Sequence, residues 1–350
     1  MSGAGERVRL GIIGLGIMGE AYARIYSQHP LAAVVAVCSR RRERVEEIQA
    51  RYAVPHGATD YRALLDGPDL DAVVVATPDR EHFGPALAAL QSKRHVLIEK
   101  PMTTSVAEAD ELLRAARTAG RLIQVAFNHR WLSAYYQAKQ LIAAGEIGAP
   151  LAGYARKNDT IFVPTEYIRW AGETTPAWFL GSHDIDLMRW FLDAEPLEAR
   201  AWGRREVLAG RSIATYDVIQ AQVKFSSGAF VTFESAWVYP RSFPSIVDSF
   251  VELIGTAGHV HLDRKCESLE VSTVEKFSYP KGFLLAEIFG RLRGAFPQCL
   301  EDFLFAIREN RPPAVTGEDG RQVTATLEAI HRSLETGRSE PVAPPVPAAS

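Results

Sequence analysis

Hydrophobic and polar positions divide the chain into two regions with different periods. From residue 7 to about 130, continuous apolar runs such as AAVVAVC (32–38) and DAVVVATP (71–78) alternate with charged amphipathic stretches such as RRERVEEIQARYA (41–53). Uninterrupted apolar strands separated by helices are typical of a parallel sheet that is buried on both faces. The first region is therefore predicted to be an α/β domain with a doubly wound parallel sheet.

The second region has a different pattern. A helical stretch, TPAWFLGSHDIDLMRWFLD (175–193), precedes a strand-rich segment from 198 to 280 that contains YDVIQAQVKF, the turn SSG and AFVTFESAWVY. Apolar–polar alternation across a tight turn indicates antiparallel hairpins with one solvated face. We predict a dinucleotide-type α/β domain over 1–128, an α+β domain with a large, mainly antiparallel open sheet over 129–337, and a loose Pro- and Ala-rich tail over 338–350.

Composition narrows the class of protein. The 350 residues are 47% hydrophobic and 23% charged, with a formal net charge of −3, so nothing favours nucleic acid or an anionic membrane as a partner. The three cysteines match no metal or redox spacing, and no metal site is expected. The first residues lack the apolar core of a secretory signal, and no apolar run approaches the ~20 residues of a membrane span. A cytoplasmic location is expected.

A glycine motif follows the first strand. GIIGLGIMG contains Gly14, Gly16 and Gly19 in G-x-G-x-x-G spacing, after a strand and at the start of a helix. In this context Gly14 allows a tight turn, Gly16 lets the backbone approach a pyrophosphate, and Gly19 lets the helix pack closely on the sheet. Anions are favoured at the helix N-terminus, where Ile17 and Met18 lie. We predict a Rossmann dinucleotide site rather than a purely structural turn.

The end of the second strand indicates the type of cofactor. NAD sites usually carry an acid about 20 residues after the glycines, but here the chain reads Ser39, Arg40 and Arg41, and no acid precedes Glu43. A hydroxyl group followed by guanidinium groups suits a 2′-phosphate. NADP(H) is therefore the preferred cofactor and NAD(H) is possible. The alternative is that the arginines only begin a solvated helix.

Two further segments end strands at the same edge of the sheet. ATPDREH (76–82) follows one apolar strand, and the charged pair Glu99 and Lys100 follows HVLI (95–98) and precedes Pro101. Ligands of open doubly wound sheets bind beyond the carboxyl ends of the strands. A solvated turn would also explain the charged pair, but its position favours a functional lysine.

Taken in order, GLGIMG, ATPDREH, EKP and HDIDLMRW resemble the Gfo/Idh/MocA family of oxidoreductases. The resemblance implies hydride transfer between a nicotinamide and a carbon of a sugar, polyol or related cyclic substrate. It makes Lys100 a catalytic or substrate-orienting group, with Pro101 shaping its turn through a possible cis peptide. It also implies a homodimer or homotetramer formed through the strand-rich sheet. The predicted cofactor residues are Gly14, Gly16, Ile17, Met18, Gly19, Ser39, Arg40, Arg41, Ala76, Thr77, Pro78, His82, Glu99, Lys100 and Asn128.

His183 is the second catalytic candidate, because an imidazole transfers protons near neutral pH. In many members of the family an aspartate lies four residues before this histidine, but here that position is Phe179. The partner of His183 stays open between Asp184, Asp186 and Asn158. The predicted substrate residues are Arg130, Lys157, Asn158, Tyr167, Trp178 and Asp184.

The leading hypothesis is an NAD(P)-dependent dehydrogenase or reductase of a sugar or polyol. Two alternatives remain: a nicotinamide-binding sensor or regulatory protein without turnover, which Phe179 favours, and a reductase of a non-sugar carbonyl. The particular substrate, the direction of the reaction and the oligomeric state are not determined at this stage.

Overall fold

A computed structural model describes residues 7–346, and the chain forms two compact units. One contains the residues up to Phe127 and the segment Pro297–Arg321, and the other contains Asn128–Phe296 and the residues from Gln322 onward. The boundary at Phe127 lies next to the predicted boundary at residue 128. The return of residues 297–321 to the first unit was not predicted, because their sequence has the same helical period as the helix that follows them.

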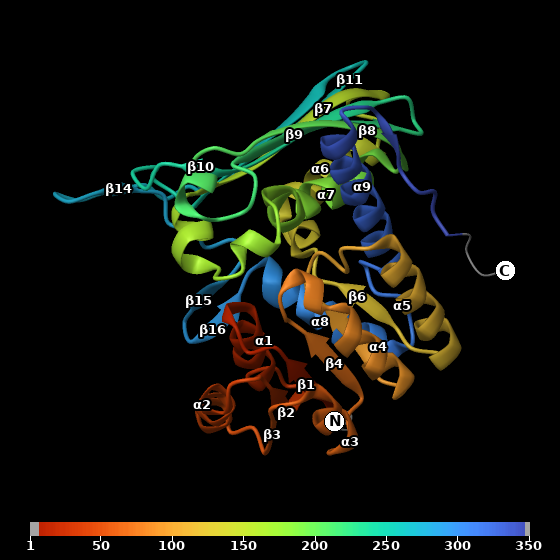
Figure 1. The fold of residues 1–350 in the computed structure, drawn as a ribbon, viewed down its shortest axis with the longest axis vertical. Coiled ribbons are helices and arrows are strands. Elements are labelled where there is room, and N and C mark those ends of the chain that lie inside the picture. Colours follow the sequence, from red (N-terminus) through yellow and green to blue (C-terminus); the bar gives the residue numbers. More distant parts are fainter. Residues whose placement is uncertain (1–6, 347–350) are drawn as a thin grey trace. The chain divides into compact units, whose positions relative to one another are not determined.

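The first unit is a six-stranded parallel sheet in the order β3-β2-β1-β4-β5-β6. Helices α1 and α2 pack against each other, and α3 and α5 both pack against α4; helices lie on both sides of the sheet (Figure 1). This confirms the predicted doubly wound α/β fold. The elements are β1 (Val8–Ile13), α1 (Ile17–Ser27), β2 (Ala32–Cys38), α2 (Arg42–Tyr52), β3 (His56–Ala58), α3 (Tyr61–Asp66), β4 (Ala72–Val75), α4 (Phe83–Gln91), β5 (His95–Ile98), α5 (Val106–Ala119) and β6 (Ile123–Val125).

The core of this unit follows from the apolar runs. All four residues of β4 are fully buried, as expected for a central strand with helices on both faces. Helix α8 (Ala295–Glu309) is joined to the same unit by two hydrogen bonds from buried side chains. Tyr26 donates to the Leu300 carbonyl at 3.3 Å, and the Gln124 amide donates to the Cys299 carbonyl at 2.8 Å.

The second unit is a seven-stranded sheet in the order β12-β11-β7-β10-β9-β8-β17. All neighbouring pairs are antiparallel except β7 and β10, which confirms the mainly antiparallel open sheet. Helices α6, α7 and α9 lie along one face of it (Figure 1). The larger elements are α6 (Ser133–Ala143), β7 (Pro150–Thr160), α7 (Ser182–Leu192), β8 (Pro196–Arg204), β9 (Val218–Phe225), β10 (Phe230–Tyr239), β11 (Val247–Gly255), β12 (His259–Asp263) and α9 (Gly317–Thr336).

Short elements complete this unit. Two small hairpins lie between β12 and α8, and a π-helical turn, η5 (Ala177–Gly181), leads into α7. The tail is partly ordered: β17 (Glu340–Pro341) pairs with β8, and the Val342 amide donates to the Leu197 carbonyl at 2.9 Å. The prediction of a loose tail from residue 338 was therefore wrong for this part, and residues 347–350 lie outside the described residues. The short strands are β13 (Val271–Ser272), β14 (Phe277–Ser278), β15 (Ala286–Ile288) and β16 (Arg291–Arg293).

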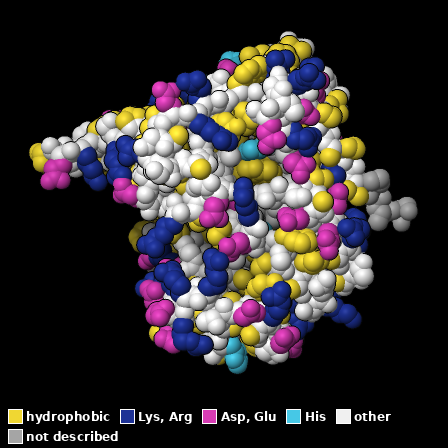
Figure 2. Space-filling model, viewed as in Figure 1, with side chains coloured by type: hydrophobic (Ala, Val, Ile, Leu, Met, Phe, Trp, Pro, Cys, Tyr) yellow, Lys and Arg dark blue, Asp and Glu magenta, His cyan; other side chains and the backbone are white. Residues whose placement is uncertain are grey.

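The surface charge and the hydrophobicity of the helices also bear on the predictions. Basic and acidic side chains are interspersed over the face drawn in Figure 2. Within residues 7–346, no helix combines the length and apolarity that a membrane crossing needs.

Candidate functional site

The glycine loop between β1 and α1 has the geometry of a phosphate cradle. Gly14 has a φ of +92°, and a Cβ there would lie 2.4 Å from the Ala76 carbonyl oxygen, while a Cβ on Gly19 would lie 1.8 Å from the Gly14 carbonyl oxygen. These two glycines are required by the packing. A Cβ on Gly16 would meet no atom of residues 7–346 within 4 Å. The bare backbone of Gly16 at the N-terminus of α1 therefore leaves open space where a pyrophosphate binds, so these residues fit a dinucleotide.

Arg44 on α2 holds the glycine loop through a hydrogen bond to its backbone. Its Nε donates to the Leu15 carbonyl at 2.9 Å, and its guanidinium also pairs with Glu20 on α1 and with Glu47. This role was not predicted, because Arg44 has the pattern of any charged residue in an amphipathic helix.

The end of β2 carries the residues predicted to select the cofactor. Ser39 Oγ accepts the Arg41 amide at 3.4 Å, and Arg40 pairs with Glu81 at 3.3 Å while four-fifths of its side chain stays exposed. Glu81 belongs to η1 (Asp79–Glu81) within the ATPDREH segment. The structure therefore brings Arg40 next to that segment, at the carboxyl edge of the sheet.

His82 joins ATPDREH to the EKP turn. Its Nδ1 lies 2.7 Å from the Pro101 carbonyl oxygen and its Nε2 lies 2.8 Å from the Thr77 carbonyl oxygen. His82 is 1% exposed. It thus joins two segments of the predicted cofactor edge.

The charged pair at the end of β5 is Glu99 and Lys100. Glu99 is buried, and its two carboxylate oxygens accept the Tyr22 hydroxyl at 2.7 Å and the Lys100 amide at 3.1 Å. Burial and the Glu99 carboxylate raise the pKa of Tyr22 well above its ordinary value. Glu99 therefore anchors the turn to α1. The predicted cis peptide is present between Lys100 and Pro101.

A cavity of about 410 Å³ lies elsewhere in the first unit, at the amino ends of the strands. Two of its basic side chains already have partners within the chain: Arg9 pairs with Asp69 and Asp71, and Arg121 Nε donates to the Lys93 carbonyl at 2.7 Å. It contains none of the predicted cofactor residues.

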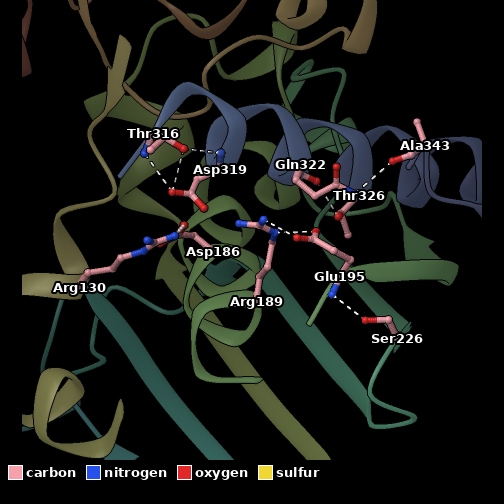
Figure 3. A network of polar contacts seen from close by, with 10 residues as sticks. All are labelled: Arg130, Asp186, Arg189, Glu195, Ser226, Thr316, Asp319, Gln322, Thr326 and Ala343. Atoms are coloured by element: carbon pink, nitrogen blue, oxygen red, sulfur yellow. Dashed lines mark hydrogen bonds and ion pairs between the residues drawn. The ribbon is translucent and has the colours of Figure 1, made fainter. Parts of the chain in front are cut away.

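In the second unit, α7 presents His183 and two acids. His183 is 9% exposed, and its ring stacks on His129 of η2 (Asn128–Trp131) with centroids 4.1 Å apart and planes at 14°. Asp184 pairs with Lys157 of β7. Asp186 accepts both Nε and Nη2 of Arg130, at 2.9 and 2.5 Å (Figure 3).

These ion pairs change the predicted roles of their members. Arg130 and Asp186 are buried and satisfy each other, which is the arrangement of a structural pair. Burial lowers the pKa of Lys157 and raises that of Asp184, and the attraction between the two opposes both shifts. Lys157 and Asp184 lie beside His129 and His183, as the prediction of a common site requires.

Asn158 lies apart from that group. Adjacent strand residues point to opposite faces, and Asn158 Nδ2 donates to Glu234 at 2.7 Å and to the Tyr239 hydroxyl at 3.0 Å. Lys157 instead reaches α7. Lys157 and Asn158 were predicted to contact the same substrate because they are adjacent at the end of one strand. In the structure their side chains point to opposite faces of β7.

The remaining predicted residues are scattered within the second unit. Trp178 is buried and stacks on His331 with centroids 5.1 Å apart, whereas Tyr167 is 42% exposed and contacts Phe162. Asn128 is buried, and its Oδ1 accepts no hydrogen bond from the described residues. Over residues 7–346, no group of three or more His, Cys, Asp or Glu side chains is arranged to hold a metal ion.

Phe179 has a structural explanation. Its ring packs against Trp170 and Trp237, with centroid distances of 5.9 and 5.6 Å, at the edge of an apolar cluster that includes Val163 and Leu180. A carboxylate in this position would be partly buried, next to two aromatic rings. His129, which the sequence analysis passed over between Asn128 and Arg130, is the side chain found against His183 instead.

A parallel sheet with a dinucleotide cradle, followed by an α+β unit with a buried histidine pair, defines a nicotinamide-dependent oxidoreductase. Residues 8–127 match the family described as "Oxidoreductase family, NAD-binding Rossmann fold", and residues 139–343 match its C-terminal alpha/beta domain. The chain belongs to this family, Gfo/Idh/MocA, which confirms the resemblance.

Curated relatives and solved structures cover almost the whole chain. It is 28% identical to the myo-inositol 2-dehydrogenase of Thermotoga maritima, over 95% of this chain and 98% of that one. It is also 28% identical to a Bacillus subtilis protein named scyllo-inositol 2-dehydrogenase (NAD(+)), over 90% of each. The scyllo-inositol dehydrogenase of Lactobacillus casei, solved with NAD(H) and scyllo-inositol, superposes with a TM-score of 0.84 at 22% identity, over 96% of this chain and 99% of that one; this last likeness shows the fold.

Proposed function

We propose that the protein is an NAD(P)-dependent dehydrogenase that oxidises a CH–OH group of a cyclic polyol or sugar, or reduces the corresponding ketone. The observation that carries this proposal is the turn at the end of β5. Glu99 anchors the turn to α1 through Tyr22, and His82 holds it to the ATPDREH segment. Lys100 is thereby fixed at the edge of the sheet where dinucleotide-binding folds hold their ligands.

The residues of the chain have separate roles in this proposal. The nicotinamide supplies the hydride acceptor or donor when bound. Lys100 donates a hydrogen bond to the oxygen of the reacting carbon and stabilises the charge that develops there. His183 takes the hydroxyl proton in the oxidative direction and returns it in the reductive direction. The inositol dehydrogenase names of the relatives point to cyclitols as the first substrates to test.

A panel of polyols tests this function. Purified protein is mixed with myo-inositol, scyllo-inositol or D-glucose and with NADP⁺ or NAD⁺, and the absorbance of reduced nicotinamide is followed. We expect turnover on at least one cyclitol. A protein that binds the cofactor but turns over none of these substrates would instead support a nicotinamide-binding sensor or regulatory protein. Turnover only on non-sugar ketones would support the other alternative, a reductase of a non-sugar carbonyl.

For the cofactor we propose a preference for NADP(H) over NAD(H). Ser39, Arg40 and Arg41 provide a hydroxyl group and two cations at the end of β2. The Arg40 guanidinium pairs with Glu81 but stays four-fifths exposed, and we propose that it contacts a 2′-phosphate. Relatives whose names specify NAD make a quantitative test necessary.

Arg40→Ala provides that test. We expect it to weaken NADPH binding about 10- to 100-fold, because a charge-assisted contact of roughly 1.5–3 kcal/mol is lost, and to leave NADH binding nearly unchanged. Binding is measured by quenching of tryptophan fluorescence. Arg62→Ala, a change on α3 away from the glycine loop, is the control. Equal or tighter binding of NADH by the wild type would show that the arginines only begin a solvated helix.

A further inference from the structure

The aspartate that is missing at residue 179 leaves the question of what controls the protonation of His183. The three residues considered from the sequence have these contacts: Asp184 pairs with Lys157, Asp186 pairs with Arg130, and Asn158 donates to Glu234. The side chain that covers the ring of His183 is His129, stacked in parallel at 4.1 Å.

His129 has a second neighbour that restricts its tautomer. Lys157 Nζ lies 3.5 Å from His129 Nδ1, at the outer limit of a hydrogen bond, while it also donates to Asp184. An ammonium group only donates, so the contact requires a lone pair on Nδ1 and places the ring proton of His129 on Nε2. The nearby ammonium charge also disfavours a second proton on this ring. His129 is therefore held neutral.

A neutral ring affects the protonation of the histidine stacked on it. Two imidazolium cations 4.1 Å apart would repel each other, whereas one imidazolium over the π-face of a neutral ring is attracted to it. Both histidines and the Lys157–Asp184 pair are nearly excluded from solvent, so this effect is only weakly screened. The stack thus assigns the titration to His183 alone.

We propose that His129 is a positioning residue that keeps His183 as the single proton-transferring imidazole of the stack, and that the Lys157–Asp184 pair fixes the tautomer of His129. This inference rests on the proposed function for its role in catalysis. Its electrostatic content can be measured without turnover.

Other charged and titratable groups also face this cluster. They are the Arg130–Asp186 pair, Tyr135 of α6, whose ring packs edge-on against His129 with centroids 6.1 Å apart, and Arg264 and Asp159, which act on Lys157 at longer range. None of them is altered in the variants below, so they contribute equally to every comparison.

The first experiment is an NMR titration of ¹³C,¹⁵N-histidine-labelled protein between pH 5 and 9, with His183 and His129 assigned from His183→Gln and His129→Gln. In the wild type we expect His183 to titrate in one step while His129 remains a neutral Nε2–H tautomer. In Lys157→Met/Asp184→Leu, which removes both charges and leaves no unpaired one, His129 also titrates and the His183 midpoint falls by about half a unit or more. His259→Ala, a change on the exposed end of β12, is the control and leaves the midpoint unchanged.

A series at residue 129 separates positioning from simple packing. His129→Ala removes the π-face, so the His183 midpoint falls by about half a unit to one unit. His129→Phe restores the face, and with it most of the midpoint. His129→Gln keeps a flat group and an acceptor for Lys157. An unchanged His183 midpoint in both His129→Ala and the double variant would overturn the proposal, as would protonation of both rings in the wild type.

Kinetic measurements test whether the stack of His129 and His183 affects the reaction. With an active substrate, His129→Ala should lower kcat about 10-fold, change KM less, and move the acidic limb of the pH profile to lower pH, while His129→Gln should recover part of kcat. If the wild type turns over no polyol, the proposed function fails, but the NMR titration still decides whether His129 controls His183. If His129→Ala does not fold, His129→Gln and the double variant provide the same comparison.

Discussion

Glu99 and Lys100 are adjacent residues to which the proposed mechanism gives different roles. The sequence identified the pair as unusual because charges follow a buried strand, and it assigned both residues to the cofactor. In the structure Glu99 is a buried acceptor for Tyr22 and for the Lys100 amide. A motif can therefore show which turn matters without showing which of its charges performs the chemistry.

Tyr22→Phe tests the role of Glu99. The variant removes a donor from a buried carboxylate, which should lower the free energy of unfolding by about 1–3 kcal/mol and lower kcat by loosening the Lys100 turn. Tyr26→Phe is a matched control on the same helix, because the Tyr26 hydroxyl only donates to the neutral Leu300 carbonyl at 3.3 Å. Urea unfolding and initial rates are measured for both. Equal losses in the two variants would contradict the anchoring role.

Residues that act through a stack or a tautomer are hard to find in a sequence. The stretch FNHRW drew attention to Asn128 and Arg130, yet His129 between them contacts His183. No spacing rule brings a histidine at the end of a Rossmann strand against one on a helix more than fifty residues later. That contact depends on the packing of η2 against α7.

Among the elements, the strands of the first unit were predicted well because each is an uninterrupted apolar run. Strand β3 was missed because it has only three residues, His56–Ala58, at an edge of the sheet, too few to show a period. The hairpin of β9 and β10 was predicted from its alternation. The parallel pairing of β10 with β7 was not, since it joins strands far apart in the sequence.

The first residue of β5 gives the fold a dependence on pH. Burial, together with the charge of Arg121, lowers the pKa of His95 to about 4, and its Nδ1 accepts the Leu122 amide at 3.1 Å. Between about pH 6.5 and 4 the unfolded chain binds a proton at this site that the folded chain does not. His95 therefore makes the fold less stable as the pH falls through that range.

His95→Asn should reduce this acid sensitivity. An amide oxygen can still accept the Leu122 amide but does not titrate, so the difference in urea midpoint between pH 7.5 and pH 5 should become smaller than in the wild type. His56→Asn, at an exposed position in β3, should leave that difference unchanged. An identical pH dependence in His95→Asn and the wild type would show that His95 does not contribute.

At the scale of the whole molecule, the exposed face of the large sheet carries apolar side chains. Trp202, Phe230 and Ile254 are 59%, 45% and 44% exposed and alternate with buried neighbours on β8, β10 and β11. The strand registers place all three on one face. We propose that the dimer or tetramer expected from the family forms through this face.

Trp202→Glu should then weaken the oligomer, because a charge would have to be buried in the interface. Sedimentation velocity of the wild type should give a mass of at least twice 38.6 kDa, and the variant should shift toward the monomer. Phe289→Asp, at a fully exposed residue between β15 and β16, is the control. A monomeric wild type would refute the oligomer itself.

The division into units shows a limit of sequence reasoning at the same scale. The boundary near residue 128 follows from the change of period, but α8 belongs to the first unit through contacts such as Gln124 with Cys299. Its amphipathic pattern shows that it packs on one side and does not show against which partner. Likewise, β17 is ordered because two of its residues pair with β8. The Pro-rich composition of this segment did not predict that pairing.

The measurement that tests the central claim most directly is a comparison of Lys100→Met with the wild type. Both are assayed for reduction of NADP⁺ and NAD⁺ by the best cyclitol of the panel, and both are titrated with reduced cofactor. If Lys100 stabilises and orients the reacting oxygen, the variant loses roughly 10²- to 10⁴-fold in kcat and binds cofactor within about twofold of the wild type. Unchanged turnover in Lys100→Met would contradict the account.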